Sequence, residues 1–125
     1  ETIRDEIEST DDAIRALGVT GDILFRPPYG GKLFTLPAYL AKTGRTTVMW
    51  DVEPESYTEI AADSQLMVEH VVDNTRPGSI IILHVMYDVR ETTRQALPGI
   101  IEGLRERGYD FVTVSDLVAR GEQTT

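Results

Sequence analysis

Short apolar runs alternate with amphipathic helical segments along this chain, and this alternation constrains its fold more than any other feature. The runs that we predict as strands are residues 23–25, 46–50, 79–83 and 111–114. The helical segments are predicted at residues 1–17, 36–43, 64–75 and 92–107, with a short closing helix capped by Ser115. Strands that alternate with helices pair in parallel through right-handed crossovers. The sequence therefore predicts an α/β fold of parallel βα units.

The chain length limits how much of such a fold can be present. The 125 residues allow one domain, which we place at residues 1–120, followed by a polar tail at residues 121–125. Four strands amount to about half of a (β/α) barrel, or to a small open sheet. The first predicted helix begins without a Ser, Asp or Asn ahead of it as a cap. We therefore expect the chain to be cut from something longer.

Composition excludes several classes of function. Twelve basic residues against 21 acidic ones give a net charge of −9, which repels phosphate backbones and anionic lipid, so no nucleic-acid partner is expected. No apolar run approaches the ~20 residues of a transmembrane helix. The absence of cysteine excludes disulfides, thiolate zinc sites and cysteine nucleophiles. With only two histidines, His70 and His84, the chain cannot form a three-histidine metal site.

Reactive side chains follow three consecutive predicted strands. They are Arg26 after the first strand, the acids Asp51, Glu53 and Glu55 after the second, and His84 after the third. The carboxyl ends of parallel strands are where α/β folds gather their functional residues. Two explanations stay open for each group. His84 is either a general acid or base, or a structural histidine that is hydrogen-bonded within a loop. Arg26 either makes a bidentate contact with a carboxylate at the site or forms a structural salt bridge. The three acids either bind a ligand and transfer protons, or simply face solvent in their loop.

These strand ends resemble the polysaccharide deacetylases, the NodB-homology or carbohydrate esterase family 4 enzymes. Residues 25–30 (FRPPYG) resemble the third motif of that family, and residues 77–84 (PGSIIILH) resemble the fifth. Residues 96–117 are similar to the family's closing helix, strand and helix, so the resemblance covers essentially the whole chain. It implies the C-terminal part of a distorted, TIM-like (β/α) barrel. It also implies a hydrolase that removes N-acetyl groups from aminosugar polymers such as peptidoglycan or chitin.

The resemblance implies a role for each matching residue. His84 would be the general acid that protonates the leaving amine, and Arg26 would orient the aspartate that acts as the base. The turn at Pro28 and Tyr29 would hold the oxyanion through the backbone N–H of Tyr29. Tyr57 and Leu83 would line the pocket for the methyl group of the acetyl substituent.

The chain departs from the family pattern in two places. The first two motifs, which carry the aspartate base and the metal-ligating aspartate and histidines, do not occur in it, so a divalent metal, usually zinc, is expected to be bound upstream of Glu1. In the fourth motif, Ser56 and Tyr57 stand where the family commonly has Asp and Trp. A serine cannot supply the charge that raises the basicity of the catalytic histidine. We therefore expect Asp51 or Glu53 to take that part, or the acid to be tuned less strongly.

Three hypotheses for the function follow. The first is a metal-dependent polysaccharide deacetylase, with this chain carrying the general-acid half of the site and inactive alone. The second is a non-catalytic carbohydrate-binding or scaffold relative without the metal motifs. The third, an unrelated α/β binding or receiver-like domain, is disfavoured because Arg26 and prolines replace the acidic cluster expected after the first strand.

Expected partners are an aminosugar polysaccharide and, through an open sheet edge, the missing N-terminal part or a second copy. The family implies an extracellular or cell-envelope location.

Overall fold

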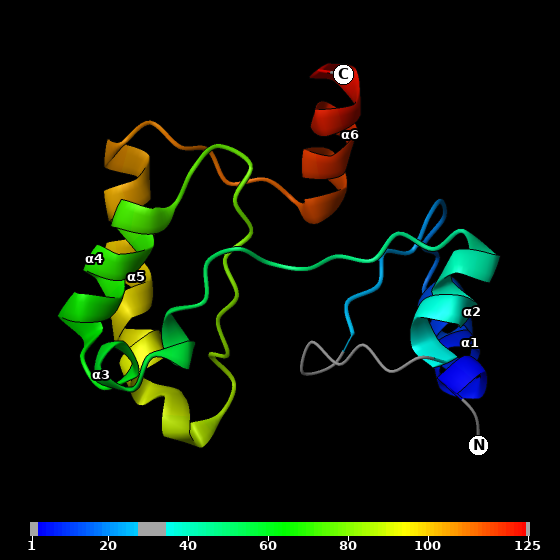
Figure 1. The fold of residues 1–125 in the computed structure, drawn as a ribbon, viewed down its shortest axis with the longest axis horizontal. Coiled ribbons are helices and arrows are strands. Elements are labelled where there is room, and N and C mark those ends of the chain that lie inside the picture. The colour runs from blue at the N-terminus through cyan, green and yellow to red at the C-terminus, as the bar shows by residue number, and fades with distance from the viewer. Residues whose placement is uncertain (1–2, 28–34, 125) are drawn as a thin grey trace. The chain divides into compact units, whose positions relative to one another are not determined.

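The computed structural model describes residues 3–27 and 35–124. Its contacts separate into two compact units, Glu1–Met49 and Trp50–Thr125 (Figure 1). The first unit contains the helices α1 (Ile3–Ala16) and α2 (Thr35–Thr43). The second contains the 3₁₀ turns η2 (Pro54–Ser56) and η3 (Asp88–Arg90) and the helices α3 (Thr58–Ala61), α4 (Ser64–Asn74), α5 (Glu91–Glu106) and α6 (Val114–Thr124). The four longer predicted helices are thus confirmed as α1, α2, α4 and α5.

A small apolar core joins α1 to α2 in the first unit. It contains Ile7 and Leu40, with Ile3, Phe25 and Tyr39 packed against them. α1 ends at the predicted place, because Gly18 adopts the left-handed conformation at φ 90°. Arg45 donates two hydrogen bonds to the carboxylate of Asp11, at 2.6 and 2.8 Å, and so ties α1 to the segment after α2.

The second unit is built on the close packing of α4 against α5 (Figure 1). Its buried core contains Val52, Met67, Val71, Val72, Ala96, Ile100 and Leu104. Two glycines of α5 face valines of α4: a Cβ on Gly99 would lie 2.9 Å from Val68, and one on Gly103 would lie 2.8 Å from Val72. The absence of a Cβ at both positions therefore sets how closely the two helices approach.

Caps define the ends of two helices in this unit. The side chain of Asp63 accepts hydrogen bonds from the second and third residues of α4, Gln65 N at 2.9 Å and Leu66 N at 3.1 Å. The predicted cap of the closing helix was wrong, because Ser115 lies inside α6. The hydroxyl of Thr113 instead accepts from Asp116 N at 3.2 Å. α6 continues to Thr124, so it includes most of the predicted polar tail at residues 121–125.

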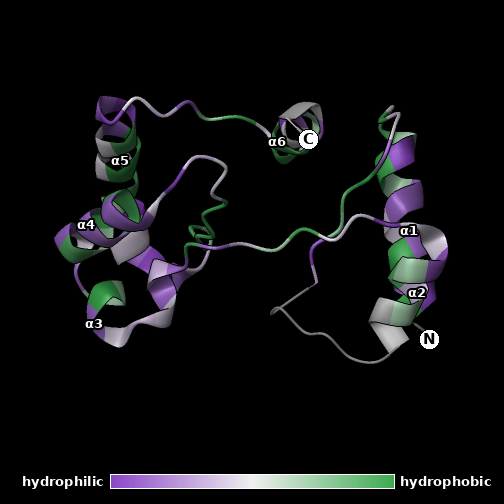
Figure 2. Ribbon diagram, turned by 45° about the horizontal axis from the view of Figure 1, so that its top comes forward, coloured by the Kyte–Doolittle hydropathy of each residue, from purple (hydrophilic) through white to green (hydrophobic). Residues whose placement is uncertain are grey.

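Three of the predicted strands pair at a single position each within the described residues. The fourth predicted strand, at residues 111–114, was wrong, because residues 111–113 take part in no bridge and Thr113 caps α6, which begins at Val114. Phe25 pairs with Thr47, and Val52 pairs with Ile81, and both bridges are parallel as predicted. Continuous ladders do not form among these residues. Around the second bridge the reason is visible: carboxylates of Asp51 and Glu55 accept the backbone N–H groups of Ile80 and His84, which a neighbouring strand would otherwise bind. The apolar run at residues 80–83 appears green in Figure 2.

Candidate functional site

A buried carboxylate, that of Glu55, lies at the centre of the candidate site. It projects from η2, which follows the bridge residue Val52 and starts at the buried Pro54. Proline at the first position of such a turn has its φ already fixed and needs no donor there. The Glu55 side chain is only 3% exposed, so its charge depends on groups of the protein rather than on water.

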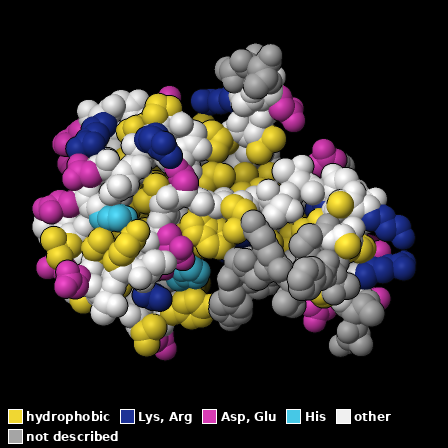
Figure 3. All heavy atoms as spheres, in the orientation of Figure 1, with side chains coloured by type: hydrophobic (Ala, Val, Ile, Leu, Met, Phe, Trp, Pro, Cys, Tyr) yellow, Lys and Arg dark blue, Asp and Glu magenta, His cyan; other side chains and the backbone are white. Residues whose placement is uncertain are grey.

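His84 meets this carboxylate with both its backbone and its ring. Its backbone N–H donates to Glu55 Oε1 at 3.1 Å, and its ring Nδ1 lies 2.6 Å from Oε2. Because an ionised carboxylate only accepts hydrogen bonds, Nδ1 carries the proton in this contact. The other ring nitrogen, Nε2, is then left to exchange a proton with a substrate. The His84 side chain is 35% exposed, and histidine side chains (cyan) reach the surface of this unit in Figure 3.

Two further groups complete the surroundings of the Glu55 carboxylate. The buried hydroxyl of Thr93, on α5, donates to Oε1 at 2.7 Å, and the Nε atom of Arg90, on η3, lies 3.9 Å from the same oxygen. Burial acts to raise the pKa of Glu55. The hydrogen bonds from His84 and Thr93 and the positive charge of Arg90 outweigh it and hold that pKa below its usual value. Glu55 is therefore an anion at neutral pH.

The loop that follows His84 places an aromatic ring beside the imidazole. Tyr87 stacks on His84 with ring centroids 6.0 Å apart and an interplanar angle of 27°. Arg94 fixes this loop by donating to the carbonyl groups of Val85, Tyr87 and Asp88, at 2.9, 2.7 and 3.3 Å. The side chain of Tyr87 is 55% exposed. The imidazole therefore sits between a buried acid and a partly exposed aromatic ring.

The acids predicted to tune His84 are engaged elsewhere, which corrects that expectation. Asp51 accepts from Ser79 Oγ at 2.8 Å and from Ile80 N at 2.7 Å, so it joins two segments of backbone. Glu53 accepts from the indole of Trp50 at 2.9 Å. Glu55 contacts the histidine instead.

The other predicted site residues are distributed over both units. Arg26 is exposed and lies in the first unit, whereas His84 lies in the second. Tyr57 is 54% exposed and packs its ring against His70, with centroids 5.1 Å apart. Leu83 is partly buried and packs against the core of the second unit. Pro28 and Tyr29 lie outside the described residues, so their assigned roles stay predictions.

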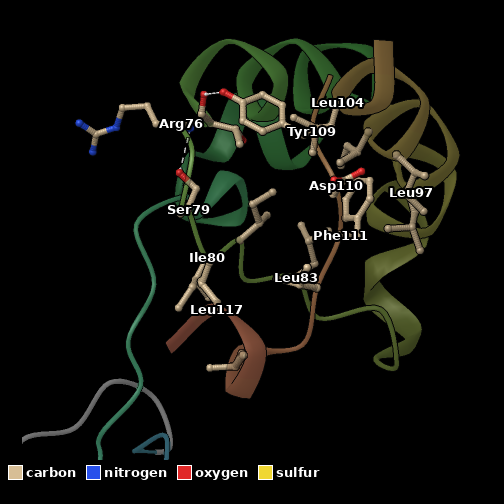
Figure 4. Close-up of a pocket in the computed structure, with 17 residues that line it drawn as sticks. Arg76, Ser79, Ile80, Leu83, Leu97, Leu104, Tyr109, Asp110, Phe111 and Leu117 are labelled. Carbon is tan, nitrogen blue, oxygen red and sulfur yellow. Dashed lines mark hydrogen bonds between the residues drawn. The ribbon is translucent and has the colours of Figure 1, made fainter. Parts of the chain in front are cut away.

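Leu83 also borders an apolar cavity of about 390 Å³ within the second unit (Figure 4). Aliphatic side chains from the segment 80–83 and from α5 form much of its lining: Ile80, Ile81, Leu83, Leu97, Ile100 and Leu104. Tyr109 closes one part of the lining, where its hydroxyl donates to Thr75 O at 2.9 Å. The space is a partly open hollow among the extended segments, α5 and α6, and it gives Leu83 an apolar environment.

Sequence reasoning missed three residues of this site. Glu55 was recognised as one of the acids in its loop, but it was not assigned to His84. Thr93 carried a usable signal, because it is a polar residue on the apolar stripe of α5, and a buried hydroxyl requires a partner. Arg90 carried no local signal, since its proximity to Glu55 arises only from the chain reversal between the segment 80–84 and α5.

The described residues do not provide a metal site. Within residues 3–27 and 35–124, no three His, Cys, Asp or Glu side chains come together in a way that could hold a metal ion. The donors of the candidate site are already used, because both oxygens of Glu55 and Nδ1 of His84 bond to one another and to Thr93. These residues therefore do not fit a metal centre.

No helix in the described part of the chain is long and apolar enough to span a membrane.

Comparison with known proteins shows consistent similarity to one class of enzyme. No family model matches the chain. A peptidoglycan-N-acetylglucosamine deacetylase from Bacillus cereus is 38% identical over 77% of this chain and 45% of its own length. The solved structure of peptidoglycan deacetylase PdaC from Bacillus subtilis has a TM-score of 0.72 and 30% identity over 94% of this chain and 55% of that one. A family 4 carbohydrate esterase from Streptomyces lividans, solved with acetate, has a TM-score of 0.64 and 34% identity over 82% of this chain and 50% of that one.

The chain spans less than half the length of the Bacillus cereus relative and about half of each solved structure. A TM-score of 0.72 alongside 30% identity over 94% of the chain shows that the similarity extends over both units and not only over the motifs.

Proposed function

The chain belongs to the polysaccharide deacetylase family, and from this premise we propose that it supplies the general-acid half of a site that hydrolyses N-acetyl groups on an aminosugar polymer. One observation carries the proposal: Nδ1 of His84 lies 2.6 Å from the buried carboxylate of Glu55. A histidine held in this way has one nitrogen committed to an acid and the other left for chemistry, which is the arrangement that general acid–base catalysis requires.

The chemistry follows from this tautomer. Hydrolysis of an acetamide adds water to the carbonyl carbon and then breaks the C–N bond, which gives acetate and a free amine. The amine leaves only when it is protonated, and Nε2 of His84 supplies that proton in the proposed step from the imidazolium form, which carries a proton on each ring nitrogen and returns to the neutral ring protonated on Nδ1. The imidazolium form is stabilised by the ionised carboxylate of Glu55, in the way that a buried acid supports the histidine of a hydrolase triad. In this chain Glu55 thus takes the part that Asp plays in the family's fourth motif.

Other residues of the chain have proposed parts that rest on the resemblance to the family. Leu83 and Tyr57 line the space for the acetyl methyl group, and the apolar surroundings of Leu83 support this assignment. Arg26 orients the aspartate that acts as base. The turn at Pro28 and Tyr29 contributes a backbone N–H to the developing oxyanion.

Family 4 carbohydrate esterases are generally metal-dependent. We propose that the complete site uses a divalent ion, zinc in the first instance, whose ligands are other than the described residues of this chain. The ion would polarise the acetamide carbonyl and activate water. The Bacillus cereus and Bacillus subtilis relatives act on peptidoglycan by their names, so we propose an aminosugar polysaccharide of the peptidoglycan or chitin type as substrate and the cell envelope or exterior as location.

A chimaera tests the proposal directly. The segment of the Bacillus subtilis PdaC deacetylase domain that aligns with this chain is replaced by this chain, and acetate release from peptidoglycan and from N-acetylglucosamine oligomers is measured with and without added zinc. We expect release by the chimaera and a loss of about 10²-fold or more in His84→Ala. His70→Ala is the comparison variant, because it removes the other histidine, which lies on α4; since His70 packs against Tyr57, this variant also measures the effect of disturbing the proposed methyl pocket without removing the histidine bound to Glu55.

The unmodified chain is assayed in parallel and is expected to release no acetate. A chimaera that folds with a dispersed NMR spectrum and yet releases no acetate would favour the non-catalytic carbohydrate-binding alternative. Equal activities of His84→Ala and His70→Ala would remove His84 from the proposed mechanism.

A further inference from the structure

Arg90 has an unusual position for a cation in the second unit. Its side chain is about one-third exposed, but its Nε atom is buried and has no hydrogen-bond partner in the described structure. A buried N–H group without a partner costs free energy, and native proteins contain few of them. A side chain that extended fully into solvent would avoid this free-energy cost. Because Nε of Arg90 is buried instead, we expect another interaction of the guanidinium to compensate for the missing hydrogen bond.

The nearest such interaction is with the Glu55 carboxylate. Nε lies 3.9 Å from Glu55 Oε1, the oxygen that already accepts from Thr93 Oγ1 and from the backbone N–H of His84. The contact is too long for a hydrogen bond but short enough for a charge interaction, which solvent screens only in part because the Glu55 side chain is 3% exposed and the Arg90 side chain is 34% exposed. The guanidinium therefore faces Glu55 through Oε1, while the His84 ring faces it through Oε2.

We propose that Arg90 is a positioning residue for the proposed general acid His84 and acts through Glu55: it places a second positive charge on the buried carboxylate, opposite the imidazole. This inference rests on the proposed function, because it gives Arg90 a part in proton transfer by His84, but the experiment that tests it does not measure that function. With Glu55 alone, the imidazolium would be held by a full, desolvated negative charge, and release of its proton would be costly. Arg90 offsets part of that charge, so that the acid can give its proton to the leaving amine.

The groups that face the pair support an assignment to Arg90 in particular. Tyr87 contributes a phenol ring stacked on the imidazole, and Thr93 contributes a neutral hydroxyl from α5. The neighbouring Arg94 is used differently, since it bonds to Glu91 and to carbonyl groups of the loop. Of these groups, Arg90 is the one that brings a positive charge to Glu55, and Coulombic attraction by Arg90 contributes to the lowered pKa of that residue.

NMR titration of the 125-residue chain tests the proposal without any need for deacetylase activity. The carboxyl carbon of Glu55 and the imidazole of His84 are followed with pH in the wild type, Arg90→Gln and Arg90→Lys. Loss of the cation is expected to move the titration of Glu55 to higher pH, by at least about 0.5 unit, whereas Arg90→Lys retains the charge and stays close to the wild type. His70 serves as an internal reference. Arg76→Gln is the matched control, since Arg76 faces Asp51 instead.

Three results would overturn the proposal. Unchanged titrations in Arg90→Gln would show that its charge does not reach Glu55. Equal shifts in Arg90→Gln and Arg90→Lys would indicate a structural rather than an electrostatic role. Loss of the folded spectrum in both Arg90→Gln and Arg90→Met, each of which keeps much of the aliphatic stem, would make Arg90 a folding residue. Because no acetate is measured, none of these results depends on whether the proposed hydrolysis is correct.

Discussion

Replacement of Gly103 by alanine should destabilise this protein, although alanine is the better helix former. Gly103 lies in the interior of α5, where the change from glycine to alanine normally stabilises a helix by about 0.8–1 kcal/mol. Here the new Cβ would meet Val72 Cγ2 at 2.8 Å, below the distance at which carbon atoms pack. Valine on a helix has one strongly preferred rotamer, so Val72 cannot turn aside. The helices must therefore separate.

The magnitude follows from these two opposing terms. Overpacking of a tight core contact costs about 1–3 kcal/mol. Subtracting the propensity gain leaves a net loss of about 0–2 kcal/mol of unfolding free energy, centred near 1 kcal/mol. Urea denaturation followed by circular dichroism measures it as a lower midpoint at an unchanged slope. The change should also disturb the candidate site, because α5 carries Thr93, which bonds to Glu55.

Two controls separate packing from propensity. Gly121→Ala makes the same substitution within α6, where the added Cβ would meet nothing within 4 Å, and it should not destabilise. Val72→Ala removes the obstructing methyl groups, so the double variant Gly103→Ala/Val72→Ala should be more stable than the sum of the single effects by about 0.5–2 kcal/mol. Stabilisation by Gly103→Ala equal to or greater than that by Gly121→Ala would refute the close approach of α4 and α5.

Three further predictions concern the carboxylates of Glu55 and Asp11 and a hydroxyl that bonds to one of them. Because the pKa of Glu55 is lower in the folded chain than in the unfolded one, its stabilising effect is present above about pH 4.3 and is lost as pH falls through the folded value. Glu55→Gln should therefore be less stable than the wild type at pH 7, by about 1–3 kcal/mol, and the difference in thermal unfolding should narrow as the pH is lowered through the folded value. Thr93→Val keeps the shape but removes the donor to Oε1, and it should cost about 1–2 kcal/mol in urea denaturation, whereas a neutral effect would contradict the 2.7 Å hydrogen bond. Asp11→Asn should weaken the pairing with Arg45 and lower the stability of the first unit by about 1 kcal/mol, seen as faster amide hydrogen exchange in α1 and α2 and not in α5.

The helices of this protein could be predicted because their causes are local. The apolar stripes of α1 and α5 repeat at helical spacing, and glycines follow both helices at positions 18 and 108 with positive φ. The parallel direction of the two bridges was equally accessible, since strands linked by a helix pair in that direction. The length of the paired strands could not be predicted from the sequence. Carboxylates of Asp51 and Glu55 take up backbone amides beside the bridge, and no local pattern shows which side chain will do so.

The sequence by itself determined that a histidine ends a buried apolar run and that three acids lie within the five residues 51–55. The tertiary structure alone decided which acid serves the histidine. The partners of Glu55 come from 29 and 38 residues along the chain, at His84 and Thr93, whereas Glu53 bonds to an indole three residues away. Local propensities cannot distinguish side chains whose surroundings are assembled from distant segments. The buried position of Glu55 follows from the 3₁₀ turn at Pro54 and the packing of α5, and only the folded chain contains both.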